Sequence, residues 1–327
     1  MNDPSGIAFS DIEAAAARLE TVVHHTPVLM SQELDARAGA RVSLKCENLQ
    51  RAGAFKIRGA YNKLATLAPE VRAHGVVAYS SGNHAQGVAL AARIFGVPAT
   101  ICVPETIIPF KRAATEAYGA VVVLAGRTSE DREIRARSLA AERGASLVPP
   151  YDDPAIIAGQ GTVALEFLRQ VPGLDVLITP VGGGGLLAGC ALVARALCPG
   201  IRIVGIEAED ANDTFLSLQA GRRIRIPAPH TIADGMRALE PGELTFPIIK
   251  ALVDEIVLVR DADIEAAMCF LLEHVKVLVE PTGAVGVAAL LAGRITGVAG
   301  RRVGVVLSGG NVDPAALVQI LKRAAGE

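Results

Sequence analysis

Short runs of β-branched residues alternate with alanine-rich stretches through most of the chain. Val76–Tyr79, Ala99–Val103 and Val121–Leu124 have the length and composition of buried strands, and a helix-like stretch follows each of them. The same alternation returns at 176–181 and 202–206. Because strands that are separated by helices pair in parallel, this order predicts sheets with helices on both faces. We therefore assign the chain to the α/β class.

The helix-like stretches are expected at 86–95, 110–118, 129–143 and 186–197. Thr128 precedes the third of them and Asp131 lies three residues later, which is the spacing of a capping box. Another helix is expected to begin after 261–263 and to contain the apolar run 264–279. The composition changes near 148–154, a segment with three prolines, so the chain is predicted to cross between two domains there.

The composition favours a globular protein that acts on a small molecule. Hydrophobic residues make up 51% and charged residues 20% of the 327 residues, which is enough for a large core and about two domains. The net charge is −2 and the arginines are scattered, so no basic face for nucleic acid is expected. Pro180 and a run of glycines interrupt the longest uncharged stretch, 176–194, and we expect no membrane helix.

The cysteines point to a reducing compartment. Their number is odd, they are widely spaced in apolar surroundings, and no CxxC pair occurs; they are Cys46, Cys102, Cys190, Cys198 and Cys269. Such a pattern is typical of buried, reduced thiols. The N-terminus also lacks the basic and then apolar sequence of a secretory signal. We expect a cytoplasmic protein.

A lysine and a run of four glycines indicate which chemistry the chain performs. Lys56 lies between Phe55 and Ile57, and apolar neighbours disfavour the charged form of an amine, which leaves a nucleophile for an aldehyde. Gly182–Gly185 lie between a strand-like and a helix-like stretch, where backbone amides hold phosphate. A reactive amine and a phosphate cradle are two parts of a site for pyridoxal phosphate (PLP).

The glycine run also permits another interpretation. Residues 183–188 satisfy the loose dinucleotide pattern GxGxxA, and Glu207 ends the next strand about 20 residues later, where a ribose would be bound. The run alone does not decide between the two cofactors. Four loops follow apolar strands, however, and loops at the carboxyl ends of parallel strands converge on one ligand crevice. We expect these loops to form one shared site; they are 80–84, 182–185, 207–213 and 308–311.

At this point the chain resembles a known family. Its motifs are similar, in order and from about residue 26 to residue 313, to those of the fold-type II PLP enzymes of the serine/threonine dehydratase and serine racemase family. The motifs are FKIRGA at 55–60, SSGNHAQG at 80–87, AGQGT at 158–162, the tetraglycine run, IADG at 232–235, EPTG at 280–283 and LSGGNVD at 307–313. The resemblance implies two open, mostly parallel sheets flanked by helices, as in the tryptophan synthase β subunit. It also implies a large PLP-binding domain of residues 1–52 and 153–327 and a small mobile domain of residues 53–152.

The resemblance assigns the cofactor contacts. Lys56 matches the lysine that binds PLP covalently and later takes the Cα proton of the substrate, and Phe55 matches a residue packed beside the cofactor. Gly182, Gly183, Gly184 and Gly185 with Leu186 match the phosphate cup, and Gly235 matches another cofactor contact. An aromatic residue such as Phe55 is equally compatible with an ordinary core position.

The resemblance also assigns the two partners of the cofactor ring. Asn83 matches the side chain that hydrogen-bonds the ring hydroxyl, and Ser308 matches the partner of the ring nitrogen. A serine hydroxyl, unlike a carboxylate, does not favour a protonated ring, which suits β-elimination. Asn and Ser beside glycine also form ordinary turn hydrogen bonds, which is the alternative for both residues.

The substrate is expected to bind at the loop Ser80, Ser81, Gly82, Asn83 and His84. Ser81 matches a serine of serine racemases and of some hydroxyaspartate dehydratases. A hydroxyl opposite Lys56 would move a proton to or from Cα and permit racemisation; alternatively, Ser81 only donates to the substrate carboxylate. Arg132 aligns with a family arginine near the substrate and would pair with a second carboxylate, or else it is a solvated helix residue.

A divalent metal site is implied at Glu207, Ala211 and Asp213, through two carboxylates and one backbone carbonyl. Ligands of oxygen alone suit Mg²⁺, Mn²⁺ or Ca²⁺, and a solvated acidic loop is the alternative.

We therefore expect a homodimeric PLP enzyme, with a tetramer as the alternative. It would remove the β-hydroxyl of a small amino acid such as L-serine or L-threonine, giving a 2-oxo acid and ammonia, with serine racemisation as a possible second activity. 3-Hydroxyaspartate is the competing substrate. A β-replacement synthase, which uses the same lysine with a second nucleophilic substrate, is also compatible with the lysine motif, and a nucleotide-binding module without catalysis is compatible with the glycine run.

Overall fold

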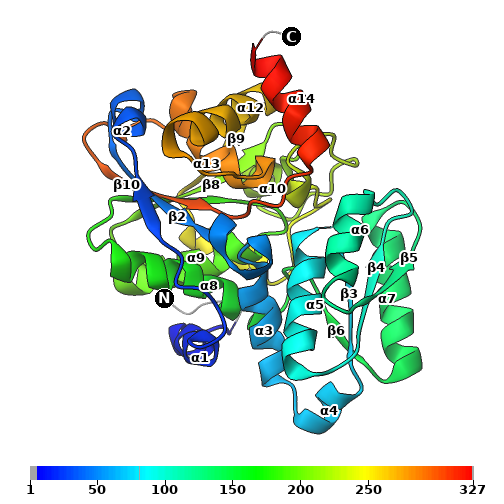
Figure 1. Ribbon diagram of the computed structural model, residues 1–327. Coiled ribbons are helices and arrows are strands. Elements are labelled where there is room, and N and C mark those ends of the chain that lie inside the picture. The colour runs from blue at the N-terminus through cyan, green and yellow to red at the C-terminus, as the bar shows by residue number, and fades with distance from the viewer. Residues whose placement is uncertain (1–5, 81, 326–327) are drawn as a thin grey trace.

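A computed structural model describes residues 6–80 and 82–325, and within these residues the strands form two separate sheets (Figure 1). The larger sheet has the strand order β1-β2-β10-β7-β8-β9, in which only the β1–β2 pair is antiparallel. Its strands are β1 (Val28–Met30), β2 (Arg41–Cys46), β7 (Val176–Pro180), β8 (Arg202–Ala208), β9 (Glu255–Val259) and β10 (Arg302–Leu307). The predicted α/β class with two mostly parallel sheets is confirmed.

The larger sheet is buried on both faces because its strands alternate their side chains between two apolar clusters. Ile178 packs into a cluster with α2, α12, α13 and α14, whereas its neighbour Leu177 packs into a cluster with α1, α8, α9 and α11. The helices are α1 (Phe9–Leu19), α2 (Gln32–Ala38), α8 (Pro154–Gln170), α9 (Gly185–Leu197), α10 (Asp213–Ala220), α11 (Thr245–Leu252), α12 (Asp261–Phe270), α13 (Pro281–Leu291) and α14 (Pro314–Ala325).

The smaller sheet is entirely parallel, with the strand order β5-β4-β3-β6. Helices α3 and α5 pack on one of its faces and α7 packs on the other (Figure 1). The strands are β3 (Val76–Tyr79), β4 (Ala99–Val103), β5 (Val121–Leu124) and β6 (Ser146–Val148). The helices are α3 (Lys56–Thr66), α4 (Pro69–Ala73), α5 (Asn83–Phe95), α6 (Pro109–Glu116) and α7 (Ser129–Arg143).

The local signals for α7 are confirmed in detail. The helix has the predicted bounds, Thr128 is its N-cap, and the Oγ1 atom of Thr128 accepts a hydrogen bond from the N–H of Asp131 at 3.0 Å. The long helix expected through 264–279 is shorter, because α12 ends at Phe270. A single π-helical turn, Leu271–Val275, follows, and Lys276 then adopts a positive φ of 66° that ends the helical backbone.

The strands of the two sheets occupy separate ranges of the chain. All strands of the smaller sheet lie between residues 53 and 152, and those of the larger sheet lie outside this range. That the smaller part is a separate and mobile domain stays a prediction. No helix among the described residues is both long and apolar enough to cross a membrane.

A buried ionic cluster fixes α3 against the larger sheet. The guanidinium of Arg58 on α3 donates to Glu47 after β2 at 2.7 Å and to Glu166 on α8 at 3.0 Å. Lys45 on β2 also pairs with Glu166. Because a buried charge is costly to leave unpaired, this cluster opposes any displacement of α3. The first turn of α3 carries Lys56, so the cluster also holds the position of that lysine.

Candidate active site

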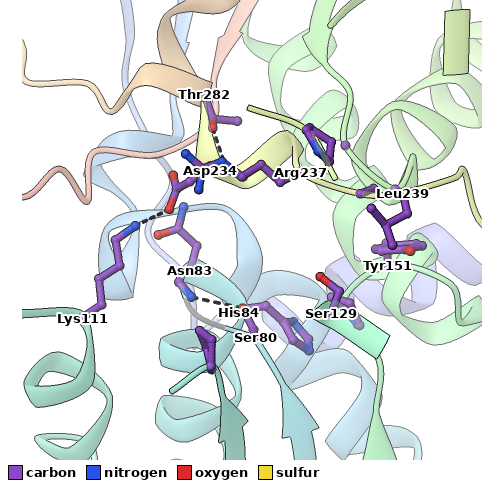
Figure 2. A pocket seen from close by; sticks show the side chains of 18 of the residues that line it. Ser80, Asn83, His84, Lys111, Ser129, Tyr151, Asp234, Arg237, Leu239 and Thr282 are labelled. Atoms are coloured by element: carbon purple, nitrogen blue, oxygen red, sulfur yellow. Dashed lines mark hydrogen bonds and ion pairs between the residues drawn. The ribbon is translucent and has the colours of Figure 1, made fainter. Parts of the chain in front are cut away.

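A cavity of about 1380 Å³ lies where the two sheets meet. The carboxyl ends of β3, β7 and β10 open onto it, as the crevice rule for parallel sheets predicts. Figure 2 shows residues from both sheets around this cavity, with Asn83 and Ser80 on one side and Asp234 and Thr282 on the other. Every described residue that was predicted to contact cofactor or substrate lines it: Phe55, Lys56, Ser80, Gly82, Asn83, His84, Arg132, Gly182–Gly185, Leu186, Gly235 and Ser308.

Lys56 begins α3 and extends into the cavity. Its Nζ donates a hydrogen bond to the carbonyl oxygen of Pro150 at 2.7 Å and lies 5.1 Å from the centre of the Phe55 ring. Burial lowers the pKa of Lys56 to about 8, against an opposing effect of the Glu280 carboxyl. The backbone N–H of Phe55 bonds the carbonyl of Ser308 at 3.1 Å, so α3 is attached to the end of β10 beside the lysine. Lys56 thus lines the cavity, and its role as the reactive amine stays a prediction.

The tetraglycine loop joins β7 to α9 and leaves no room for side chains. A Cβ atom on Gly183 would lie 2.3 Å from ring carbons of Tyr151, and one on Gly184 would lie 2.7 Å from Oγ1 of Thr245. Gly184 has a positive φ of 95°, which residues with a side chain rarely adopt. The backbone therefore approaches the cavity closely at the N-terminus of α9, where helix amides and the helix dipole stabilise an anion.

Ser308 ends β10 and is buried. Its Oγ atom has no hydrogen-bond partner among the described residues. A buried hydroxyl without a partner is unfavourable, and most such groups in proteins are satisfied by something. The Ser308 hydroxyl is therefore available to a polar atom of a ligand.

Asn83 begins α5 and is held by two other polar residues. Its Nδ2 donates to Oε1 of Glu280 at 2.6 Å, and its Oδ1 accepts from Nδ2 of Asn311 at 2.9 Å. Burial, together with the nearby Asp234 carboxyl, raises the pKa of Glu280 to about 8. Glu280 lies in the EPTG motif noted in the sequence. Its contact with Asn83 could not be predicted, because the two residues are 197 positions apart in the chain.

Other residues of the predicted substrate loop also form hydrogen bonds. Oγ of Ser80 accepts from the N–H of Gly82 at 3.2 Å. His84 is buried, its Nε2 lies 2.9 Å from the carbonyl oxygen of Val148, and burial with the nearby Lys56 lowers its pKa to about 3. His84 is thus a neutral side chain that positions the loop. Ser81, the predicted second catalytic residue, lies outside the described residues.

Arg132 extends from α7 toward the cavity. Its Nη2 donates to Oγ of Ser129 at 2.7 Å, while its buried Nε has no hydrogen-bond partner within residues 6–80 and 82–325. Burial lowers the pKa of the guanidinium, against an opposing effect of Asp131. A half-buried guanidinium with a free donor in a cavity is suited to bind a carboxylate.

Several cavity residues had no individual role in the sequence analysis. Figure 2 shows Lys111 of α6 extending to Asp234, with which it forms an ion pair, and Thr282, whose Oγ1 accepts from the N–H of Gly235 at 3.0 Å. Tyr151 packs on the tetraglycine loop from the segment between β6 and α8. The only signal for Tyr151 was its place in the proline-rich crossing segment.

Residues of three of the four predicted loops line the cavity, but the predicted metal ligands in the loop after β8 do not. Glu207, Ala211 and Asp213 are buried at the end of β8 and the start of α10, and none of them lines the cavity. The carboxylate of Glu207 turns toward α10 because it accepts from the N–H groups of Thr214 and Phe215, at 3.0 and 2.9 Å. These two hydrogen bonds fix the loop after β8 to the start of α10.

The two carboxyl groups of this loop are nevertheless unusual. Both oxygens of Asp213 are buried and without a hydrogen-bond partner in the described part of the chain. Burial raises the pKa of Glu207, and burial together with the Glu207 carboxylate raises that of Asp213. Within the described residues, no cluster of three or more His, Cys, Asp or Glu side chains is placed to hold a metal ion. A cation here would need backbone or water ligands in addition.

Comparison with known proteins agrees with this geometry. Residues 19–309 match the family described as pyridoxal-phosphate dependent enzyme. The chain is 49% identical over 305 residues to the L-threo-3-hydroxyaspartate ammonia-lyase of Saccharomyces cerevisiae, covering 93% of each chain, and 47% identical over 317 residues to that of a Pseudomonas species, covering 96% of this chain and 98% of the relative. The structure of maize serine racemase superposes with a TM-score of 0.92 at 42% identity, over 98% of both chains.

Proposed function

Because the chain belongs to the family of pyridoxal-phosphate dependent enzymes, we propose that it is an ammonia-lyase that removes the β-hydroxyl of a small hydroxy amino acid and releases a 2-oxo acid and ammonia. One observation carries this proposal above the others. Lys56, with a pKa lowered to about 8, shares one cavity with the tetraglycine loop and the unpartnered Ser308 hydroxyl. L-Serine and L-threonine are the simplest substrates of this kind.

The residues present fit PLP. The tetraglycine loop provides an anion site for a phosphate, the Ser308 hydroxyl is available to the ring nitrogen, and Lys56 provides the amine that bonds to the aldehyde. When bound, PLP supplies an electron sink for the charge that develops at the substrate Cα. The cavity therefore offers a partner for the phosphate, for the ring nitrogen and for the aldehyde of one cofactor.

Lys56 is proposed to be the base and then the acid of the reaction. A group with a pKa near the working pH can both take and return a proton, and a pKa of about 8 meets this condition. The amine takes the proton from the substrate Cα, and the resulting ammonium donates a proton to the departing hydroxyl. The hydrogen bonds of the neutral His84 to Val148 and of Gly82 to Ser80 hold the segment against which the substrate carboxylate would bind.

The test is a comparison of Lys56→Ala with Lys63→Ala, a second lysine of α3 that pairs with Asp153 outside the cavity. Purified wild-type protein should carry PLP and should release ammonia and a 2-oxo acid from L-serine or L-threonine. Lys56→Ala should lose about 10²- to 10⁴-fold in rate, the usual contribution of a general acid or base. Lys63→Ala should remain active. An active Lys56→Ala variant would contradict the proposed role of this lysine.

3-Hydroxyaspartate is a second candidate substrate, and Arg132 is the observation that favours it. This amino acid carries an additional carboxylate, and the unpartnered Nε of Arg132 offers a charged donor in the cavity. Two relatives are named for the L-threo isomer. Measuring kcat/KM for L-threo-3-hydroxyaspartate, L-serine and L-threonine on the same preparation distinguishes the candidates.

Further proposals concern metal and assembly. We propose a divalent cation at Glu207, Ala211 and Asp213, supported by the two unpartnered oxygens of Asp213, which a cation would satisfy. Serine racemisation through Ser81, a homodimer and a mobile domain of residues 53–152 are proposed from the family resemblance, and a cytoplasmic location is proposed from the cysteine pattern. Chiral analysis of the serine that remains after turnover tests the racemase activity.

A further inference from the structure

The side-chain amide of Asn83 is oriented by a short chain of hydrogen bonds. Nδ2 of Asn311 donates to the carbonyl oxygen of Ala52 at 2.7 Å and to Oδ1 of Asn83 at 2.9 Å, so both of its N–H groups are used. Nδ2 of Asn83 in turn donates one N–H to Oε1 of Glu280 at 2.6 Å. Each member of the chain therefore has a defined direction of donation.

This direction determines which atom of Asn83 is left for a ligand. Its Oδ1 already accepts from Asn311, whereas Nδ2 has two hydrogens and uses only one of them within the described residues. A rotation of the amide by 180° would place Nδ2 of Asn83 against the Nδ2 donor of Asn311 and Oδ1 against the Glu280 carboxyl. Within the described residues, the present orientation thus leaves one N–H of Nδ2 for a ligand, while Oδ1 is directed at Asn311.

Glu280 is itself held rigidly. It is 3% exposed, its N–H bonds the carbonyl of Gly309 at 3.0 Å, and a Cβ atom on Gly309 would lie 2.4 Å from its Oε1. Asp234, Lys111 and Lys56 are charged groups that interact with it, and Asp234 and Lys111 are paired with each other. Burial raises the pKa of Glu280 to about 8, so it adds little negative charge near a ligand at neutral pH. An oxygen of its carboxyl group accepts from Asn83 in either protonation state.

We propose that Glu280 is a positioning residue: together with Asn311 it fixes the Asn83 amide so that an N–H, and not the carbonyl oxygen, is presented to the cavity. The inference rests on the proposed function for the identity of the acceptor, which is the hydroxyl-derived oxygen of the PLP ring. An N–H donor stabilises that oxygen in its deprotonated form. In this proposal Glu280 acts through its hydrogen bond with Asn83.

The test compares Glu280→Ala, Glu280→Gln and Glu133→Gln. Glu133 lines the same cavity but pairs with Arg137, so its substitution removes a cavity carboxyl without affecting Asn83. For each variant the dissociation constant of PLP is measured by titration of the apoprotein, together with the absorbance of the bound cofactor and the melting temperature. Glu280→Ala should weaken PLP binding about tenfold and change the absorbance, because Asn83 is free to rotate.

Glu280→Gln should stay within about threefold of the wild type, because the amide oxygen of glutamine still accepts from Asn83. Glu133→Gln should match the wild type in affinity and absorbance. Unchanged affinity and absorbance in Glu280→Ala would overturn the inference, as would a loss in Glu280→Gln equal to that in Glu280→Ala. If Glu280→Ala does not fold, Asn311→Ala takes its place, since it removes the donor to Oδ1 of Asn83.

The outcomes separate this inference from the proposed function. If the wild type binds PLP and the Glu280 variants behave as expected, but no hydroxy amino acid is converted, the inference holds and the proposed function fails. If the wild type is an active ammonia-lyase and Glu280→Ala has unchanged cofactor absorbance and affinity, the proposed function holds and the inference fails.

Discussion

The Nζ atom of Lys56 donates a hydrogen bond to the carbonyl oxygen of Pro150, 94 residues away in the chain. The lysine at the start of α3 is thereby bonded to the segment that joins β6 to α8, the same segment in which Tyr151 packs on the tetraglycine loop. The amine must leave this carbonyl to bond an aldehyde. The contact therefore holds the lysine in place near the tetraglycine loop.

The first prediction concerns the pH dependence of cofactor capture. Burial lowers the pKa of Lys56 from 10.5 to about 8. Only the neutral amine attacks an aldehyde, so its reactive fraction should rise about tenfold per pH unit below pH 8 and level off above it. The rate at which the apoprotein takes up PLP, followed by absorbance, should show this profile. A rate that keeps rising to pH 10.5 would indicate an ordinary, solvated lysine.

The second prediction tests the phosphate cradle. In Gly183→Ala the new Cβ would lie 2.3 Å from the Tyr151 ring, so the ring or the loop must shift. Overpacking costs about 1–3 kcal/mol, and we expect the dissociation constant of PLP to rise about 10- to 100-fold. Gly200→Ala is the control, because nothing lies within 4 Å of its new Cβ. Equal PLP affinity in both variants would remove the loop from the proposed cofactor site.

Much of this architecture follows from local sequence signals. The bounds and cap of α7 were predicted from Thr128, Asp131 and the helical pattern, and they are confirmed because each signal acts within one turn. Lys56, the tetraglycine loop and Ser308 lie in one cavity because parallel strands direct their carboxyl ends to the same edge. These outcomes depend only on the order and type of the elements.

The features that were not predicted depend on contacts between residues that lie far apart in the sequence. Nothing near Asn83 indicates that Glu280 and Asn311 orient it, since these contacts span 197 and 228 residues. Glu207 at the end of β8 accepts from the N–H groups of Thr214 and Phe215 of α10, and it does not line the cavity. A carboxylate at a strand end is compatible with a place inside or outside the cavity lining, and only the packed structure decides between them.

The third prediction concerns substrate choice. If Arg132 binds the second carboxylate of 3-hydroxyaspartate, Arg132→Ala removes a hydrogen bond to a charged group, worth about 1.5–3 kcal/mol. We expect kcat/KM for L-threo-3-hydroxyaspartate to fall about 10- to 150-fold while that for L-serine changes less than about threefold. Arg137→Ala, on the same helix and paired with Glu133, is the control. Equal losses of kcat/KM for both substrates would indicate that Arg132 stabilises α7 and does not bind the second carboxylate.

The last prediction concerns the loop after β8. Asp213 has two buried, unpartnered oxygens within the described residues, and a cation bound there only in the folded state stabilises that state. Mg²⁺ at one hundred times its Kd should raise the free energy of unfolding by about 2.7 kcal/mol relative to chelator, as measured by urea denaturation. Asp213→Asn should lose most of this response, because one of two carboxylate ligands is neutralised. Asp210→Asn, at an exposed position of the same loop, should keep it. An Mg²⁺ effect of the same size in both variants would place any cation elsewhere in the protein.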